Sequence, residues 1–396
     1  MKPLLFSVLP RPTHPTRDGL AIRNFHLLRA LAGSFRVRAF VLRAPHLAGA
    51  SGYPEGVEVE EFPQLPRLVR KARAAAASLL FGGAYSPRLY GSAKLEASLS
   101  RDAARERPSW IVAHSYHVGP LAVGRGRPSW VDFHNLDSVI WERMSETASR
   151  LPVRAFAGLQ APRVRAVERR LLMTAEGVSC VSAPDASDLL RLAPDSAPLV
   201  VPNAVDLTRY EFHPARPGDG VILFVGDLSW PPNAEGLRWF AERVWPLVRA
   251  AAPEARVEVL GRGAPASLVR RAPSSPDWKF LGEGGDTRPH WSRADVAIVP
   301  LRAGGGTRLK ILEAAACGVP VVSTTVGSEG LDLEDGREIL LRDEPPDFAD
   351  ALVRLLRDAP LREKLAAAAR ARVERRYDWR RIGEDFAGEL LRRGRP

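Results

Sequence analysis

The sequence predicts an α/β protein made of two doubly wound parallel sheets. Short apolar runs alternate with stretches whose apolar residues recur at helical spacing, and this alternation is typical of a parallel sheet covered by helices. The alternation restarts after a segment rich in Pro, Gly and charge. The length of 396 residues fits two or three domains at roughly 150 residues each.

The first half of the chain begins with an apolar run. Residues 3–10 (PLLFSVLP) precede a Pro-rich loop, and apolar residues then recur at helical spacing over 21–33 until Gly33 ends the helix. Further short strands are expected at 37–43, 57–62, 109–115, 128–135 and 177–182, with a helix over 160–175.

The second half repeats this scheme. A strand at 220–228 leads into a helix that starts near residue 234. The linker is expected within 201–220, so the domains are expected at 1–212 and 213–376, with an end helix in 377–396. Further strands are expected at 255–261, 279–282, 295–300, 319–325 and 337–341, and further helices at 347–358, 361–376 and 377–393.

The charge balance indicates an anionic partner. The formal charge is +11, which favours a nucleotide, a lipid surface or a nucleic acid, although an arginine-rich composition without such a partner is the plain alternative. The basic stretches 67–83 and 161–172 combine cations with apolar residues at helical spacing. Each is either a solvated helix face or a contact with anionic lipid. Nucleic acid is disfavoured, because no aromatic stacking platform or known binding module is present.

The two cysteines, Cys180 and Cys317, form no CxxC pair and no Cys/His ligand set, which fits a reducing cytosol and argues against structural zinc. The apolar run at the start of the chain is too short for a signal peptide or a membrane span and is expected to be the first strand. A cytoplasmic location is therefore expected.

The stretch AGGGTRLKILEAAACG (303–318) is the main candidate site. It follows the strand at 295–300 and leads into a helix. Glycines let backbone N–H groups approach an anion, and a helix N-terminus adds about half a positive charge. A simple turn is the alternative, and GxxxxGK[ST] is absent. The predicted phosphate-binding set is Gly304, Gly305, Gly306, Thr307, Arg308, Leu309 and Lys310.

Glu313 follows Lys310 by one helical turn. One interpretation is a salt bridge between the two side chains. The other is that the carboxylate accepts hydrogen bonds from sugar hydroxyls, for instance a ribose diol. The small residues that follow Glu313 predict that it faces inward.

Polar residues also end two strands of the first half. VDFHNLDS (131–138) places Asp132, His134 and Asn135 at a strand end, where open α/β sheets bind ligands. His134 is predicted to be a hydrogen-bond partner or proton carrier with a pKa near neutrality, with a structural role as the alternative. His114 and His117 are further candidates for substrate contact.

GRGAPA (261–266) fits the dinucleotide fingerprint G-x-G-x-x-A in its loosest form. Pro265 interrupts the expected helix start, and no acidic residue ends a following strand at the usual distance. A loop with turn glycines is the favoured interpretation. This stretch is the single support for an epimerase or an NAD-linked oxidoreductase.

These motifs together resemble glycosyltransferase family 4, the retaining GT-B enzymes, in its bacterial group 1 branch. The resemblance rests on GDLSWPPNAEGLRWF (226–240), ADVAIVPLRAGGGTRLKILEAAACGVPVVSTTVGSEGL (294–331), DGREILL (335–341), DFHNLDS (132–138) and VPNAVD (201–206). It implies two Rossmann-like domains that face each other across a cleft, with the C-terminal helix crossing back to the first domain.

The resemblance also implies a function. The chain would move a sugar, without a metal or other cofactor and with retention of configuration, from a UDP or GDP sugar to a hydroxyl of a glycan or lipid-linked acceptor. That activity would serve cell-envelope or exopolysaccharide synthesis, in the cytoplasm or at the inner face of the plasma membrane. A non-catalytic nucleotide-sugar-binding protein is the main alternative.

Several residues match the family pattern. Glu313 stands at the second Glu of the Glu-x7-Glu motif, which binds the ribose. His134 is similar to the first-lobe histidine close to the transferred sugar, and Gly19 to the glycine of the N-terminal loop beside the phosphates. Gly226 completes the predicted donor-binding set.

Two positions depart from the pattern. Gly305 stands where the first Glu is expected, and Asp227 and Pro232 stand where the family places an Arg and a Lys that hold the diphosphate. We expect Arg308 and Lys310 to supply that charge instead, so the predicted catalytic residues are His134, Arg308 and Lys310.

Overall fold

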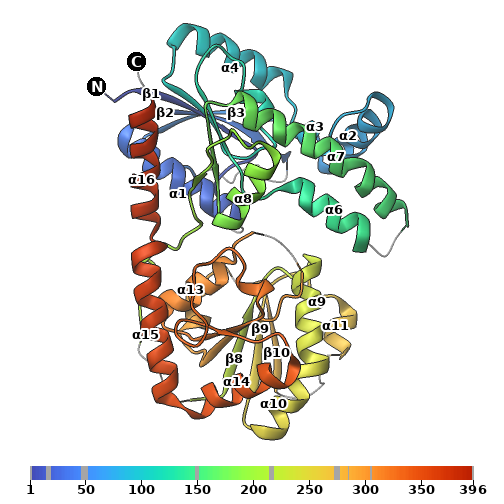
Figure 1. The fold of residues 1–396 in the computed structure, drawn as a ribbon, viewed down its shortest axis with the longest axis vertical. Helices are drawn as coiled ribbons and strands as arrows, with labels where there is room; N and C mark the ends of the chain where they lie inside the picture. The colour runs from blue at the N-terminus through green and yellow to red at the C-terminus, as the bar shows by residue number, and fades with distance from the viewer. Residues whose placement is uncertain are drawn as a thin grey trace. The chain divides into compact units, whose positions relative to one another are not determined.

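The computed structural model describes residues 2–14, 19–45, 52–147, 151–213, 218–271, 277–283, 285–303 and 306–394. The chain forms two compact units (Figure 1). Unit 1 comprises Met1–Pro202 with Arg380–Pro396, and unit 2 comprises Asn203–Trp379. The division therefore falls before the expected boundary at residue 212, and the chain beyond Trp379 belongs to unit 1.

Unit 1 contains a parallel sheet whose described strands run in the order β3-β2-β1-β4-β5-β6-β7. The central strands are short and buried on both faces, which explains their continuous apolar sequences. The strands are β1 (Leu4–Leu9), β2 (Arg36–Arg43), β3 (Val57–Pro63), β4 (Trp110–Ala113), β5 (Ser129–Asp132), β6 (Gly177–Cys180) and β7 (Leu199–Val200).

Helices connect these strands and cover the sheet of unit 1. The helix predicted over 160–175 is the second part of a longer helix, α7, which continues through Pro162. The helices are α1 (Gly19–Ser34), α2 (Arg67–Phe81), α3 (Tyr85–Arg88), α4 (Ala93–Glu106), α5 (Gly119–Ala122), α6 (Asp137–Thr147), α7 (Leu151–Thr174) and α8 (Ala183–Leu192).

The last helix, α16 (Trp379–Arg393), packs within unit 1. The indole Nε1 of Trp110 donates to the carbonyl of Leu390 at 2.8 Å, and the rings of Trp130 and Phe386 meet edge to face at 5.6 Å. A Cβ on Gly383 would lie 2.4 Å from the Cβ of Ala30, so a small residue is required where α16 passes α1.

Unit 2 contains the second parallel sheet, with its described strands in the order β10-β9-β8-β11-β12-β13. Its core packs Trp245, Trp278 and Phe348 against buried Val and Ile side chains of the sheet. The strands are β8 (Val221–Val225), β9 (Arg256–Leu260), β10 (Trp278–Gly282), β11 (Val296–Val299), β12 (Val321–Ser323) and β13 (Leu340–Leu341).

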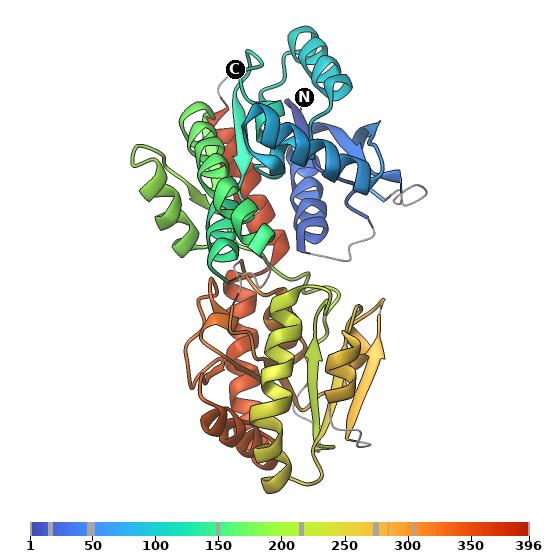
Figure 2. The ribbon, with the colours of Figure 1, turned by 90° about the vertical axis from the view of Figure 1, so that its right-hand side faces the viewer.

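Helices follow the strands of unit 2 in the same alternating pattern (Figure 2). They are α9 (Pro231–Trp239), the π-helical turn η2 (Phe240–Val244), α10 (Trp245–Ala251), α11 (Ala266–Arg271), α12 (Arg288–Trp291), α13 (Leu309–Cys317), the 3₁₀ turn η3 (Val326–Ser328), α14 (Pro345–Arg357) and α15 (Ala359–Arg376). The predicted fold class, two doubly wound parallel sheets, is confirmed.

Candidate functional site

The candidate site of unit 2 lies where the loops after β8, β9 and β11 meet at the carboxyl ends of their strands. The loop after β11 leads into α13, which begins at Leu309 with Arg308 as its N-terminal cap residue. Gly306 has φ 76°, a left-handed conformation that favours glycine. Gly304 and Gly305 lie outside the described residues.

Lys310 reaches from α13 to the end of β8. Its Nζ donates to Oδ1 of Asn233 at 3.0 Å and lies 4.6 Å from the centre of the Phe224 ring. A Cβ on Gly226 would be 2.7 Å from Nζ, so a larger residue there would displace the lysine. The ammonium therefore lies beside the loop after β8. This is the loop in which Asp227 and Pro232 stand where the family pattern has an Arg and a Lys.

The environment of Lys310 disfavours its charge. Burial, the larger cause, and the neighbouring Arg308 together lower the pKa of Lys310 to about 7, although Glu313 acts in the opposite direction. Within the described ranges Lys310 forms no salt bridge; its partner Asn233 is a neutral amide. An anion bound here would stabilise the charged lysine and raise its pKa.

Arg308 is a second buried cation at the start of α13. Its guanidinium donates to the carbonyl of Gly306 and lies 5.7 Å from the centre of the Trp230 ring. Thr307 accepts a hydrogen bond from Nδ2 of Asn203 at 2.6 Å. Both cations and the first turn of α13 thus give this corner of unit 2 a positive character.

Two asparagines belong to the site although they were not predicted. Asn233 orients Lys310 and also donates to the carbonyl of Asp227 at 2.9 Å. Asn203 holds Thr307. Both lie in motifs that carry the resemblance, WPPNAEG and VPNAVD, and this was the available signal.

Asp227 does not approach the cations of α13; its partner is Arg262. The Arg262 guanidinium donates to the carboxylate at 2.8 Å and 2.9 Å, and Ser229 donates at 2.5 Å and 2.9 Å. Burial opposes ionisation, but these hydrogen bonds outweigh it and lower the pKa of Asp227. Leu228 N–H also donates to the Arg262 carbonyl, so residues 261–265 form a loop packed on the loop after β8, and α11 begins at Ala266 in spite of Pro265.

Glu313 is held by neutral donors. Its Oε2 accepts from Oγ1 of Thr287 at 3.2 Å and from Nε1 of Trp291 at 3.1 Å, and Tyr210 also bonds the carboxylate. Burial raises the pKa of Glu313, while these hydrogen bonds and Lys310 act in the opposite direction. No salt bridge joins Glu313 to Lys310 among the described residues, so the salt-bridge interpretation is wrong. Ribose binding stays a prediction.

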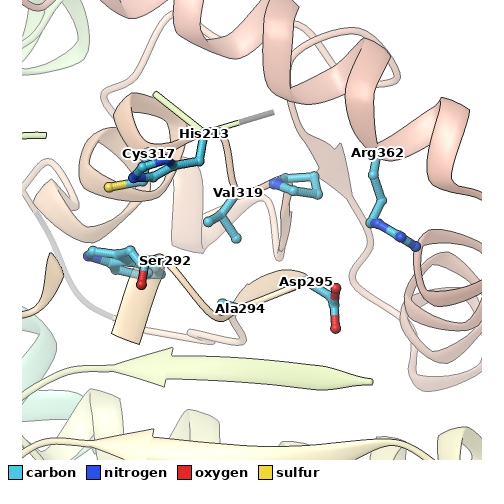
Figure 3. Close-up of a pocket in the computed structure, with 10 residues that line it drawn as sticks. His213, Ser292, Ala294, Asp295, Cys317, Val319 and Arg362 are labelled. Atoms are coloured by element: carbon cyan, nitrogen blue, oxygen red, sulfur yellow. The ribbon is translucent and has the colours of Figure 1, made fainter. Parts of the chain in front are cut away.

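A small cavity lies near the other end of α13 (Figure 3). It is bordered by His213, Ser292, Cys317 and Arg362. Its volume is about 20 Å³, enough for a single water molecule and too small for a nucleotide. This cavity is therefore not the donor site.

The strand ends of unit 1 carry a buried ion pair. Arg23 of α1 donates from Nε and Nη2 to the two carboxylate oxygens of Asp132, both at 2.8 Å, and both side chains are 1% exposed. Ser179 donates to Oδ1 of the same carboxylate at 2.7 Å. The charges at this site are thus neutralised within unit 1.

His134 adjoins this ion pair. Its Nε2 lies 3.0 Å from Oδ2 of Asp132. Burial lowers the pKa of His134 below its ordinary 6.5, and the favourable contribution of Asp132 does not overcome this. The pKa of His134 is therefore shifted downward from its ordinary value, which favours the uncharged imidazole. Gly19 is the first residue of α1.

The other two histidines differ from each other. His114 is fully buried against Oγ of Ser7 at 3.2 Å, and burial lowers the pKa of His114 to about 4, which indicates a structural role. His117 is partly exposed, with Nδ1 2.7 Å from Oγ of Ser115 and Nε2 3.3 Å from Asp137.

The described ranges of both units contain no candidate metal cluster and no candidate membrane span. No group of three or more His, Cys, Asp or Glu side chains there is arranged to hold a metal ion. Nor does any helix in those ranges combine the length and the apolar character needed to cross a bilayer.

The fold and this site define a protein with two Rossmann-like units and a cationic helix start at the strand ends of the second. The same architecture occurs in sucrose-phosphate synthase from Thermosynechococcus elongatus, with a TM-score of 0.74 at 18% identity over 99% of this chain and 98% of that one. Anabaena HepE in complex with UDP and glucose matches with a TM-score of 0.69 at 17% identity, over 98% and 99% of the chains. The fold is therefore GT-B.

Family comparison leads to the same class. The model described as glycosyl transferases group 1 matches residues 219–358, and the glycosyl transferase 4-like domain matches residues 18–204. The chain belongs to glycosyltransferase family 4, as the sequence motifs predicted.

Curated relatives match over part of their length. A GDP-mannose-dependent monoacylated alpha-(1-6)-phosphatidylinositol monomannoside mannosyltransferase from Corynebacterium glutamicum is 33% identical over 159 residues, which are 37% of this chain and 42% of that protein. The chain spans about half or less of the length of the curated relatives it matches first.

Proposed function

We propose that this protein is a hexosyltransferase that moves a sugar from a UDP or GDP sugar to a hydroxyl of a glycan or lipid-linked acceptor. The observation that carries the proposal is the position of Lys310. Its ammonium lies at the end of β8, next to Arg308 and the first turn of α13. Its hydrogen-bond partner is the amide of Asn233, and no carboxylate of the described residues forms an ion pair with it. This is an arrangement that an anionic diphosphate would complete.

The chemistry of transfer needs this charge. Breaking the anomeric C–O bond leaves its electron pair on the diphosphate, whose negative charge grows in the transition state. Lys310, Arg308 and the helix N–H groups would stabilise that charge without rearranging, because they are already in place. Glu313, fixed by Thr287 and Trp291, would accept the ribose hydroxyls.

We propose that the configuration is retained by front-face attack. The acceptor hydroxyl oxygen bonds to the anomeric carbon on the face that the diphosphate leaves, and a leaving phosphate oxygen takes the hydroxyl proton. This route needs no enzymic nucleophile and none is assigned. His134, whose lowered pKa favours the uncharged imidazole, would act as a hydrogen-bond partner of the sugar.

The remaining features of the proposal rest on the sequence and on the names of relatives. Transfer without a metal or another cofactor follows from the cations of unit 2, which would do the work of a divalent ion. One relative is named for GDP-mannose and another was solved with UDP, so both bases are candidates. A cytoplasmic role in cell-envelope or exopolysaccharide synthesis fits the basic chain, whose two cysteines are not joined in a disulfide.

The first experiment is a thermal-shift screen of UDP, GDP, UDP-glucose and GDP-mannose in the presence of EDTA. A ligand at 100 times its dissociation constant stabilises the folded state by about 2.7 kcal/mol. Transfer of labelled sugar to a membrane fraction, followed by NMR of the anomeric proton in the product, tests activity and retention.

Each outcome separates the alternatives. Absence of transfer from every UDP and GDP sugar would contradict the proposal. Binding of these nucleotides without transfer of sugar would favour the non-catalytic nucleotide-sugar-binding protein. A shift with NAD or NADP and none with these nucleotides would favour the oxidoreductase.

A further inference from the structure

Helix α2 exposes its apolar face. Leu68 is 81% exposed, Leu80 is 75% exposed, and Phe81 at the end of the helix is 80% exposed. The buried residues of α2 are Ala74 and Ser78, both small and on the opposite side. The outer face, which we call the α2 stripe, is formed by Leu68, Val69, Ala72, Ala76, Leu79 and Leu80, and the exposed Leu65 lies just before the helix.

The inner side of α2 is fixed to the body of unit 1. Oγ of Ser78 accepts from Nε2 of Gln160 at 2.9 Å, and Arg163 donates to the Ser78 carbonyl at 2.6 Å. Arg70 donates to the carbonyl of Leu89 at 3.1 Å. Figure 1 shows α2 beside α3 at the edge of this unit. The orientation of the stripe toward solvent is therefore set by specific contacts.

Cations border the stripe. Because successive residues of an α-helix are about 100° apart, Lys71 and Arg73 fall on opposite sides of the stripe. Arg67 lies farther round the helix. None of the three forms a salt bridge within the part of the chain that the structure describes, and α2 contains no acidic residue.

Helix α7 carries the other basic and apolar stretch and shows the opposite arrangement. Its apolar stripe, which includes Ala157, Val164 and Leu171, is buried in the core of unit 1. Arg169 and Arg170 are exposed on the other side of the helix, and they do not border the buried apolar stripe on the solvent side. Two stretches that look alike in the sequence thus differ in the face they offer: α7 a solvated charged face, α2 an apolar face with a cationic border.

We propose that the α2 stripe is a docking surface for a bilayer that contains anionic lipid. An apolar helix face bordered by cations, with no acid, matches the boundary between acyl chains and anionic headgroups. A globular protein partner would need an apolar groove with anionic side chains along both of its edges. An anionic bilayer offers acyl chains and anionic headgroups over its whole surface. This surface goes beyond the proposed sugar transfer and does not depend on it.

The test is sedimentation of the full chain with vesicles of phosphatidylcholine alone or of phosphatidylcholine mixed with anionic phosphatidylglycerol. We expect binding to the anionic vesicles that weakens with salt. Each cation contributes about fivefold to partitioning, so Lys71→Gln with Arg73→Gln should weaken binding about 30-fold. Leu68→Gln with Leu80→Gln should weaken it by about tenfold or more.

Matched variants on α7 are the controls. Arg169→Gln with Arg170→Gln removes the same charge, and Leu151→Gln with Met173→Gln removes exposed apolar side chains; both should bind vesicles like the unmodified chain. Failure of the unmodified chain to bind anionic vesicles, or equal losses in the α2 and α7 variants, would overturn the proposal. So would a dimer that Leu68→Gln with Leu80→Gln converts to monomer without affecting vesicle binding, because a second copy would then cover the stripe.

Discussion

The strand ends of the two units hold cations in contrasting ways. In unit 1, Arg23 forms two hydrogen bonds with Asp132 and both side chains are buried. In unit 2, Lys310 has Asn233 as its partner and forms no ion pair within the described ranges. The charge of Arg23 is therefore committed to the fold, whereas the charge of Lys310 remains available to a ligand.

The cost of burying an ion explains the contrast. Removing an ion from water costs several kcal/mol unless an opposite charge with good geometry compensates for it. The Arg23–Asp132 pair meets that condition. Lys310 does not, and its pKa falls to about 7 instead. A buried lysine without a counter-ion is charged at a cost that an anionic ligand would offset, and such shifted pKa values are typical of functional sites.

Breaking the ion pair of unit 1 should have the largest effect. Asp132→Asn leaves Arg23 buried without its counter-charge and should lower the free energy of unfolding by about 3–5 kcal/mol. Urea denaturation followed by circular dichroism measures this. Asp188→Asn, which removes the partly exposed partner of the exposed Arg191, is the control and should cost less than about 1 kcal/mol. Equal effects of the two substitutions would show that the buried pair has no special weight.

Removing the cation of unit 2 should affect catalysis and not stability. Lys310→Met should lower kcat of sugar transfer by about 10²–10³, equivalent to about 2.7–4 kcal/mol of transition-state stabilisation. Its free energy of unfolding should stay the same or increase at pH 7, because a desolvated amine is removed. Lys364→Met, at an exposed lysine of α15, is the control for both measurements. A destabilised Lys310→Met would assign this lysine to the fold, as for Arg23.

Displacing Lys310 without removing it should have a smaller effect. In Gly226→Ala the new Cβ would lie 2.7 Å from Nζ of Lys310 and 2.9 Å from Nδ2 of Asn233. The flexible lysine can move, so we expect a loss of about tenfold or more in kcat/KM with the fold intact. Gly285→Ala is the control, since nothing lies within 4 Å of its Cβ. Unchanged kinetics in Gly226→Ala would mean that the position of the ammonium is not critical.

The smallest expected effect is a pH dependence of nucleotide binding. Below its pKa of about 7, Lys310 is already charged and binds a diphosphate without taking up a proton. Above pH 7 binding requires proton uptake, so the Kd for UDP or GDP should rise about fivefold between pH 7 and pH 8. Calorimetry in two buffers of different ionisation enthalpy measures the proton uptake. Lys310→Gln should flatten this dependence, and a flat profile in the unmodified chain would contradict it.

The sequence was sufficient for the fold class and for the general place of the site. Period-2 and period-3.6 patterns follow from backbone geometry, so strands such as β8 and helices such as α13 could be assigned from local residues. The family motifs then located Lys310 and Glu313. The sequence could not show that Glu313 bonds Thr287 and Trp291 rather than Lys310. The three-residue spacing from Lys310 to Glu313 allows a salt bridge but does not require one, and the actual partners are distant in the sequence.

Side-chain partners that are distant in the sequence were decided by tertiary structure. Which loops and helices meet decides that Asn233 bonds Lys310 and that Asp132 bonds Arg23. It also decides which face of α2 points outward. Local sequence determines the period and amphipathicity of a segment, since these follow from steric rules within a few residues. Which face is buried, and which charge is neutralised, depends on the desolvation of groups brought together by the whole fold.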